Sequence, residues 1–342
     1  MKILSGKIMN YKTLKIDNLD LFFNEIKKSG KNLLVTKKKG TTTYFSSFIN
    51  INDVDFNYIQ TTISPKSVLF PKVEELISFK KDDGIYVMTE PNIEKETIVF
   101  GLRPCDAVGL EYLSNFFLNE NSDFAVKLRK ENTTLITLAC KNFDENCFCT
   151  SVGLSPASTQ GTDICLTDIG NGLFYVEIIT DKGEKLIAEH SALFSNAEKI
   201  NKENYVAQVP LKFDCDNFTK NIKDYYNSEK WVVNSLSCLG CGACAFVCPT
   251  CTCFDIEDET NLVCGTRLRC WDSCAFGIFT LHASEHNPKP MQSDRWRHRV
   301  LHKFYYSKTN MDTISCVGCG RCIRVCPAGM NILEQILDLQ EA

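Results

Sequence analysis

The sequence predicts an α+β protein with two parts, an N-terminal α/β-type domain and an α-helical dicluster ferredoxin domain. Three observations lead to this fold class. Residues 1–228 alternate segments of strand and helix periodicity, the composition changes near residue 228, and two complete cysteine motifs follow that change. We therefore expect one domain over 1–228 and a second over 229–342.

The N-terminal domain is expected to alternate strands with helices. Apolar residues at helical spacing predict a helix over 19–26, which Gly30 ends. Segments rich in β-branched and aromatic residues predict strands at 32–36, 42–49, 97–100, 133–139 and 173–179. The helix after the strand at 97–100 is expected to bury Leu110, Leu113, Phe116 and Phe117.

Composition narrows the class of partner and the compartment. The formal net charge of −4 argues against nucleic acid as the main partner, because phosphate binding needs a basic surface. We see no apolar stretch near the roughly 20 residues of a membrane span, so we expect none. The first residues, Met1 to Lys7, turn polar before the apolar core of an export signal could form. These features predict a cytoplasmic protein.

Cysteine usage points to metal. The chain has 19 cysteines, and 14 of them lie between Cys215 and Cys326, mostly in tight groups. In a chain without an export signal these thiols are kept reduced, so a disulfide framework is not expected. Crowded thiols in a reducing compartment typically bind metal.

Two cysteine runs match the pattern C-x2-C-x2-C-x3-C-P in full, from Cys238 to Pro249 and from Cys316 to Pro327. Three cysteines of such a run wrap one [4Fe–4S] cluster, and the fourth ligates the other cluster. The glycines between them let backbone N–H groups approach the sulfurs. Zinc is the alternative, but a zinc site leaves no use for the third and fourth cysteine of each run. We assign one cluster to Cys238, Cys241, Cys244 and Cys326, and the other to Cys316, Cys319, Cys322 and Cys248.

A further group of cysteines lies in the N-terminal domain. Cys105 and Cys140 each follow a predicted strand, and the carboxyl ends of strands in an open α/β sheet gather ligands. With Cys147 and Cys149 they form a candidate third iron–sulfur site, for which Asp106 is a possible substitute ligand. Buried core thiols are one alternative. A Cys147–Cys149 disulfide is another, although one intervening residue strains that ring.

Two features between the cluster motifs stay open. Cys251, Cys253 and Cys274 with His286 could supply four ligands for another metal, or could be packing residues. Basic residues also gather there. They could form a solvated face or internal salt bridges. Alternatively, they could offset the negative charge of the clusters and raise their reduction potentials, or dock an acidic partner. These residues are Arg267, Arg269, Arg295, Arg297, Arg299 and Lys303.

At several of these motifs the chain resembles the iron–sulfur β subunit of cytoplasmic sulfhydrogenases and an iron–sulfur subunit of anaerobic sulfite reductase. The resemblance rests on Pro65-Lys66, 70–76, Arg103-Pro-Cys-Asp106, Cys147-Phe-Cys149, Cys248-Pro-Thr-Cys-Thr-Cys253, Trp271-Asp-Ser-Cys274, His302-Lys303 and the second cluster motif. It implies an electron-transfer protein that works between an NAD(P)H-linked flavoprotein subunit and a catalytic subunit. That catalytic subunit would resemble a nickel–iron hydrogenase or a sirohaem reductase.

No Gly-x-Gly-x-x-Gly follows a strand, so we expect no dinucleotide site on this chain. We also assign no catalytic residue. An alternative function is an enzyme in its own right that reduces a sulfur compound or disulfide at Cys147 and Cys149 or at Cys251 and Cys253. A scaffold whose clusters only hold the fold is a second alternative.

Overall fold

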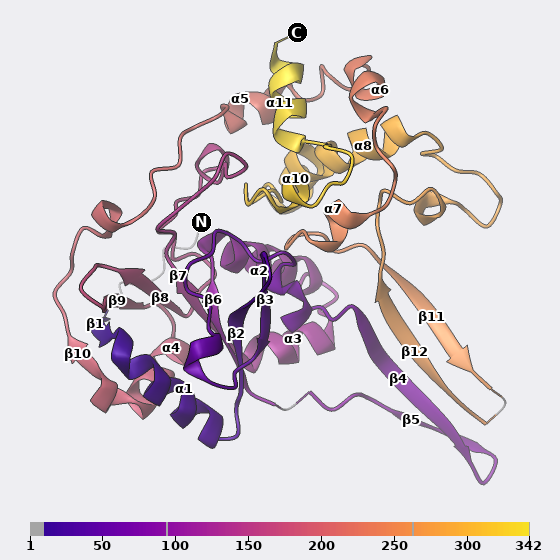
Figure 1. The fold of residues 1–342 in the computed structure, drawn as a ribbon. Coiled ribbons are helices and arrows are strands. Elements are labelled where there is room, and N and C mark those ends of the chain that lie inside the picture. Colours follow the sequence, from indigo (N-terminus) through magenta and orange to yellow (C-terminus); the bar gives the residue numbers. More distant parts are fainter. Residues whose placement is uncertain (1–9, 94, 262, 342) are drawn as a thin grey trace.

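The computed structural model of the chain describes residues 10–93, 95–261 and 263–341. Residues 1–7, on which the predicted lack of an export signal rests, lie outside this part. The described residues contain both helices and a mixed sheet, which confirms the predicted α+β class. Figure 1 shows a sheet domain, a cysteine-rich half stacked on one end of it, and a β-arm that projects to one side.

Within the described ranges, the large sheet has eight strands in the order β10-β1-β9-β8-β7-β6-β2-β3. Strands β2, β6, β7 and β8 are parallel neighbours, and the remaining pairs are antiparallel. The carboxyl ends of β6 and β7 therefore lie side by side. The strands are β1 (Asn10–Lys15), β2 (Asn32–Lys39), β3 (Thr42–Ser47), β6 (Thr97–Leu102), β7 (Thr133–Leu138), β8 (Ile164–Asp168), β9 (Leu173–Ile178) and β10 (Phe194–Asn196).

Helices cover both faces of this sheet. Helices α1 (Leu19–Lys28) and α4 (Asp181–Glu189) pack into one core, and α2 (Pro104–Phe117) and α3 (Phe124–Glu131) pack into the other. Successive residues of β6 face opposite sides, so Ile98 joins the first core and Val99 the second. The expectation for α2 is confirmed except at Phe116, whose side chain is 37% exposed.

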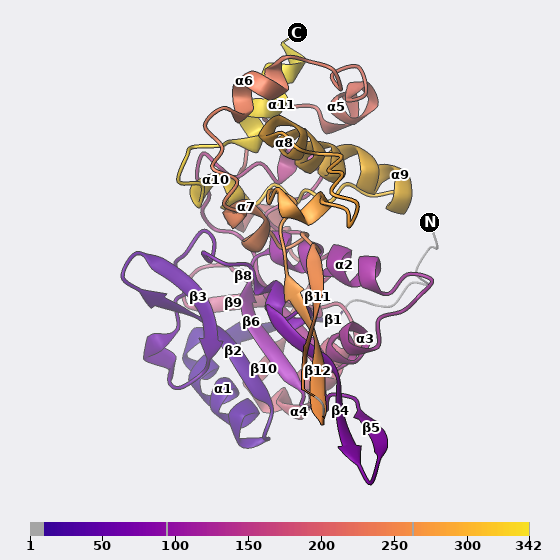
Figure 2. The same ribbon diagram turned by 90° about the vertical axis from the view of Figure 1, so that its right-hand side faces the viewer.

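A second sheet forms the projecting arm. Its strand order is β11-β12-β4-β5, from β4 (Val73–Asp82), β5 (Ile85–Thr89), β11 (Phe254–Thr260) and β12 (Cys264–Trp271). Figure 2 shows the arm below the cysteine-rich half. At its root, buried Glu74 of β4 forms salt bridges with Arg269 of β12 and Arg129 of α3. Strand pairing thus joins segments nearly 200 residues apart in sequence, at Glu74↔Arg269.

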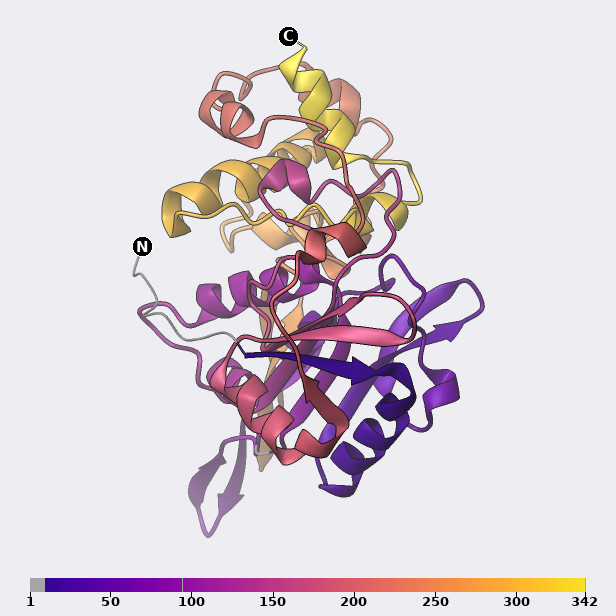
Figure 3. The same ribbon diagram turned by 90° about the vertical axis from the view of Figure 1, so that its left-hand side faces the viewer.

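The cysteine-rich half is built from short helices around a core of its own. Trp231, Trp296 and Phe304 pack in this core with Phe148 and Phe213, which precede residue 228. Figure 3 shows this half (orange to yellow) above the sheet domain from the other side. The helices are α5 (Cys215–Asn221), α6 (Lys230–Ser235), α7 (Ala243–Phe246), α8 (Gln292–Leu301), a π-helical turn (His302–Tyr306), α9 (Ser307–Met311), α10 (Arg321–Arg324) and α11 (Ile332–Gln340).

Two predictions remain untested at this level. The boundary at residue 228 stays a prediction, and so does the helical ferredoxin class, because the segment between the motifs holds the β11–β12 hairpin as well as helices. No helix of the described chain is long and apolar enough to cross a membrane.

Candidate iron–sulfur centres

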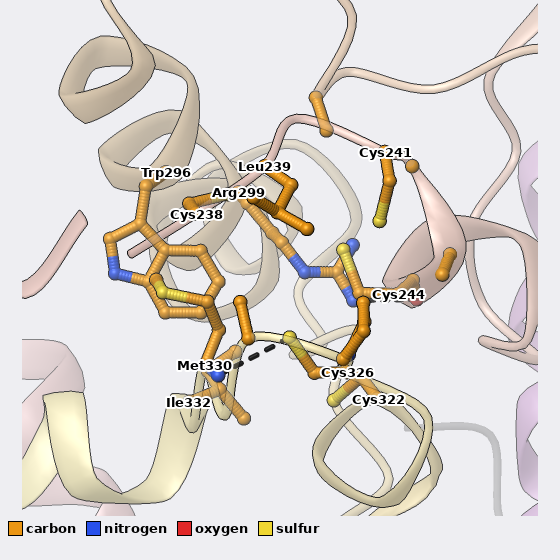
Figure 4. A pocket seen from close by; sticks show the side chains of 15 residues that line it. Cys238, Leu239, Cys241, Cys244, Trp296, Arg299, Cys322, Cys326, Met330 and Ile332 are labelled. Carbon is orange, nitrogen blue, oxygen red and sulfur yellow. Dashed lines mark hydrogen bonds between the residues drawn. The ribbon is translucent and has the colours of Figure 1, made fainter. Parts of the chain in front are cut away.

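Four cysteines from both motifs line one cavity. Cys238 and Cys241 lie in the loop before α7, Cys244 lies on α7, and Cys326 follows α10. Figure 4 shows these side chains around the cavity, with Trp296 beside them. They are the four residues predicted for the first cluster, so the structure brings that set together. Cys322 lines the same cavity.

Hydrogen-bond donors approach the sulfurs of this set. The backbone N–H of Met330 donates to Cys326 Sγ at 3.2 Å, and Gln292 Nε2 donates to Cys238 Sγ at 3.0 Å. Trp296, Met330 and Ile332 supply apolar walls. Four thiols with N–H donors and an apolar surround are the donor set of a [4Fe–4S] cluster, so these residues fit that group.

The second predicted set also gathers in one place. Cys248 is an electrostatic neighbour of Cys316, Cys319 and Cys322. Burial raises the pKa of Cys322 to about 11 and shifts the pKa values of Cys316 and Cys319 in the same direction. Thiols in such surroundings are poor anions by themselves and become thiolates when a metal binds them. The set therefore also fits a cluster.

Three buried cations surround the Cys244–Cys253 segment. Lys303 Nζ donates to Cys248 Sγ at 3.3 Å and to Thr250 Oγ1 at 3.0 Å. Arg299 donates to the carbonyl oxygen of Cys244 at 2.9 Å and to Cys251 Sγ at 3.5 Å. Each of these two cations is only 3% exposed.

Lys66, the third buried cation, comes from the sheet domain. It is 2% exposed, and it donates to the carbonyl oxygens of Ala245 at 3.2 Å and Cys251 at 3.1 Å. Its Nζ also lies 3.9 Å from the centre of the Trp271 ring. Lys66 belongs to a motif on which the predicted resemblance rests, but no role was predicted for it from the sequence.

Buried cations require negative charge nearby. Across the described residues, neither Lys66, Arg299 nor Lys303 forms a salt bridge with a carboxylate. An unpaired buried charge costs several kcal/mol. Burial lowers the pKa of Lys303, but the neighbouring Cys248 and Cys251 raise it by more, so the Lys303 pKa is raised overall. Lys303 is therefore placed to offset thiolate charge, whereas burial lowers the pKa of Lys66.

The basic residues between the motifs thus fall into two groups. Arg267, Arg269 and Arg297 pair with the carboxylates of Asp258, Glu74 and Asp294. Arg295 donates to backbone carbonyls. Arg299 and Lys303 instead contact cysteine sulfurs. The first group fits the alternative of internal salt bridges, and the offsetting of cluster charge by Arg299 and Lys303 stays a prediction.

The third group of cysteines gathers where β6 and β7 end. Cys149 has Cys140 and Cys147 as electrostatic neighbours, and Cys105 has Cys319 and Cys140. Burial raises the pKa of Cys140 to about 11 and that of Cys149 to about 12. The structure thus brings Cys140, Cys147 and Cys149 together, with Cys105 between this group and the second motif.

Two side-chain donors approach the sulfurs of this group. Arg324 donates to Cys147 Sγ at 3.3 Å, and Gln60 Nε2 donates to Cys105 Sγ at 2.8 Å. Asp106 is engaged elsewhere. One of its oxygens accepts from the Arg103 backbone N–H at the start of α2, and the other forms a buried salt bridge with Arg321. Its carboxylate therefore caps α2 and pairs with Arg321.

Gly318 brings the second and third groups into contact. It has a φ of +61°, and a Cβ at this position would lie 2.5 Å from the backbone nitrogen of Cys149. Its carbonyl oxygen accepts from the Phe148 backbone N–H at 2.9 Å. The loop that carries Cys147 and Cys149 therefore lies directly against the second cluster motif.

The predicted set of Cys251, Cys253, Cys274 and His286 does not come together as a unit. The Cys251 side chain lowers the pKa of Cys248, and Cys253 instead interacts with Cys274. His286 lies in an exposed turn next to His282, with ring centroids 5.5 Å apart. In the described part of the chain, no three His, Cys, Asp or Glu side chains converge closely enough to hold one metal ion.

Comparison with known proteins bears on these sites. Residues 237–330 match the 4Fe–4S dicluster domain family, and this segment includes every cysteine of the two motifs. The whole chain is 27% identical to sulfhydrogenase 2 subunit beta of Pyrococcus furiosus, over 97% of this chain and 99% of that protein. The predicted resemblance is confirmed. This chain is an iron–sulfur protein, and the residues that line the cavity of Figure 4, except Ile332, lie in the matched segment.

Proposed function

We propose that this protein is an iron–sulfur electron-transfer subunit. It relays single electrons between an NAD(P)H-linked flavoprotein subunit and a catalytic reductase or hydrogenase subunit. The observation that carries the proposal is the set of three buried cations beside the cluster motifs, which lack carboxylate partners in the described structure. Arg299 and Lys303 donate to cysteine sulfurs, and Lys66 donates to the carbonyl oxygen of Cys251. A bound cluster with its thiolates supplies the missing negative charge.

The ligand sets of this proposal are those predicted from the motifs. Cys238, Cys241, Cys244 and Cys326 hold one [4Fe–4S] cluster, and Cys316, Cys319, Cys322 and Cys248 hold the other. Such clusters supply one-electron oxidation and reduction. The chain contributes the thiolates, the N–H donors to sulfur, the apolar walls that exclude water, and the cations that favour the reduced, more negative form.

A third cluster bound by Cys105, Cys140, Cys147 and Cys149 extends the relay. Cys322 lines the first cavity and neighbours Cys319, and Cys319 in turn neighbours Cys105. The three sites are thus connected through adjacent cysteines, which suits stepwise electron transfer across the protein. We place the protein in the cytoplasm. Its 19 cysteines suit a reducing compartment, and no helix of the described residues could span a membrane.

The relative's name supports the proposed partners. That protein is the beta subunit of a sulfhydrogenase, so it works with other subunits. By analogy, this chain carries electrons for a complex rather than completing a reaction alone. A flavoprotein partner accounts for the absence of a dinucleotide motif in the sequence, because hydride chemistry would then take place on another chain.

Crossed ligation gives the sharpest test of the two cluster assignments. Cys326→Ser should damage the cluster held by Cys238, Cys241 and Cys244, although Cys326 belongs to the other motif. The reconstituted full chain is compared with its variant by iron and sulfide content and by electron paramagnetic resonance. Cys264→Ser is the matched control, because Cys264 is exposed and lies in no proposed set. Loss of the other cluster instead would contradict the assignment, and zinc without labile sulfide would refute the function.

The third cluster is tested by the double variant Cys140→Ser/Cys149→Ser. It should lose about four irons, one cubane, and keep both ferredoxin-type signals. The double variant Cys264→Ser/Cys270→Ser controls for the loss of two thiols outside the sets. Equal iron in the Cys140/Cys149 variant and the parent would show that these thiols are core residues.

A further inference from the structure

Cys253 and Cys274 meet at the root of the arm. Cys253 directly precedes β11, and Cys274 follows β12 by three residues. The antiparallel pairing of Phe254 with Trp271 sets the two ends opposite each other. The Asp272 backbone N–H donates to the carbonyl oxygen of Cys253 at 3.0 Å, which extends this pairing beyond the strands.

The side chains of the two cysteines are also in contact. The Cys253 side chain lies close enough to lower the pKa of Cys274, and both cysteines are free thiols. Cys274 is 9% exposed, and Cys253 is half-buried. Neither belongs to a proposed cluster set. Since no further metal-ligating group converges on them in the described chain, a site for a single metal ion does not explain their contact.

The surroundings connect this pair to the first cluster site. Cys274 is an electrostatic neighbour of Cys244, a proposed ligand. Arg299 contacts both the Cys274 thiol and the carbonyl oxygen of Cys244. The Arg299 Nε atom is buried and finds no hydrogen-bond partner among the described residues. The pair thus lies directly beside a proposed redox centre, next to a cation that stabilises a thiolate.

We propose that Cys253 and Cys274 form a dithiol–disulfide couple that exchanges electrons with the cluster held by Cys244. In the reducing direction the S–S bond breaks, two electrons arrive one at a time from the reduced cluster, and two protons from solvent complete the two thiols. In the oxidising direction the S–S bond would form, the two thiol protons would pass to solvent, and the two electrons would leave one at a time through the cluster to the next carrier. This inference rests on the proposed function, because the cluster is the electron donor and acceptor.

The geometry selects this pair over the cysteine pairs predicted from the sequence. Cys251 and Cys253 are separated by one residue, which strains a disulfide ring, and the Cys251 thiol contacts Cys248 instead. Cys147 and Cys149 have the same short spacing. The clusters carry one electron each, whereas the disulfide couple would store two. A site that stores an electron pair suits electron exchange with a two-electron partner.

The experiment uses the full chain reconstituted with iron and sulfide. Samples reduced with dithionite or oxidised with ferricyanide are denatured in iodoacetamide, digested without reductant and analysed by mass spectrometry. The oxidised sample should contain a Cys253–Cys274 cross-linked peptide, and the reduced sample should contain both residues alkylated. Dithionite titration should show about two more electrons per chain than the clusters alone accept, because one disulfide takes two.

The double variant Cys253→Ser/Cys274→Ser should lose those two electrons and keep the iron content and the cluster spectra of the parent. Cys264→Ser/Cys270→Ser, from the same hairpin, should leave the electron count unchanged. An oxidised wild-type chain with both cysteines alkylated would overturn the proposal, and this measurement needs no variant. Loss of about one cluster of iron in the double variant would instead make these residues ligands. A wild-type chain without iron would refute the proposed function separately.

Discussion

Lys303 shows how one side chain sets the properties of a cluster site. It is buried, its Nζ atom lies 3.3 Å from Cys248 Sγ, and it has no carboxylate partner in the described structure. Beside a cluster its charge favours the reduced form, since reduction adds negative charge. A positive charge near the cluster should therefore raise its reduction potential, as hydrogen bonds to the cluster sulfurs also do.

Lys303→Met should therefore lower the reduction potential of the cluster that includes Cys248, with the iron content unchanged. Coulomb's law at an effective dielectric constant of about 20 gives roughly 2 kcal/mol for unit charges about 8 Å apart, on the order of 90 mV for one electron. A redox titration followed by electron paramagnetic resonance measures the shift. Lys308→Met is the control, because Lys308 is exposed and pairs with Asp312. An unchanged potential would place Cys248 outside the cluster.

At the scale of elements, the second cluster motif is shaped by the loop against it. Gly318 and Gly329 both have left-handed φ angles, of +61° and +69°. A Cβ on Gly318 would meet the Cys149 backbone at 2.5 Å, whereas a Cβ on Gly329 would meet nothing within 4 Å. Alanine at Gly329 would therefore introduce backbone strain alone, whereas alanine at Gly318 would add a steric clash.

Gly329→Ala should cost only the strain of a left-handed alanine, about 1–2 kcal/mol. Gly318→Ala should cost more, because the 147–149 loop must also move. We expect the Gly318 variant to lose iron from the third site first. Thermal unfolding and iron analysis of both variants measure the difference. Equal effects would show that the loop is not held against the second motif in solution.

At the scale of the molecule, the two halves are joined by shared buried contacts. Arg321 of α10 and Asp106 of α2 form a salt bridge with side chains 1% and 0% exposed. Arg321 also donates to the carbonyl oxygen of Thr61 at 2.8 Å. The pairing of β4 with β12 adds a sheet that both halves build. These contacts hold the third cysteine group against the dicluster domain.

Arg321→Met should destabilise the whole chain by about 3–5 kcal/mol, because the Asp106 carboxylate stays buried without its partner. Thermal unfolding measures the loss. Arg267→Met should have no measurable effect, since the Arg267–Asp258 pair is exposed. The double variant Arg321→Met/Asp106→Leu should recover stability. The recovery should be partial, because Asp106→Leu also removes the acceptor of the Arg103 backbone N–H. A double variant less stable than Arg321→Met would contradict an unpaired buried charge.

The sequence by itself determined the chemistry of this protein. The spacing of the two motifs, the strands that precede Cys105 and Cys140, and the amphipathic pattern of α1 are local, because they depend on residues near one another in the chain. They were sufficient to predict the α+β class, the dicluster segment and the resemblance. The cavity lined by Cys238, Cys241, Cys244 and Cys326 brings together the set that the crossed pattern predicts.

Only the tertiary structure decided which distant residues meet. The arm strands β5 and β11 are exposed throughout, so they lack the buried apolar alternation that reveals a strand. Lys66 lies 179 residues from Ala245, whose carbonyl oxygen it contacts, and no local pattern marks a buried lysine as a counter-charge. The Cys253–Cys274 contact likewise depends on the register of β11 against β12. Such pairings follow from how whole elements pack, and spacing along the chain does not encode them.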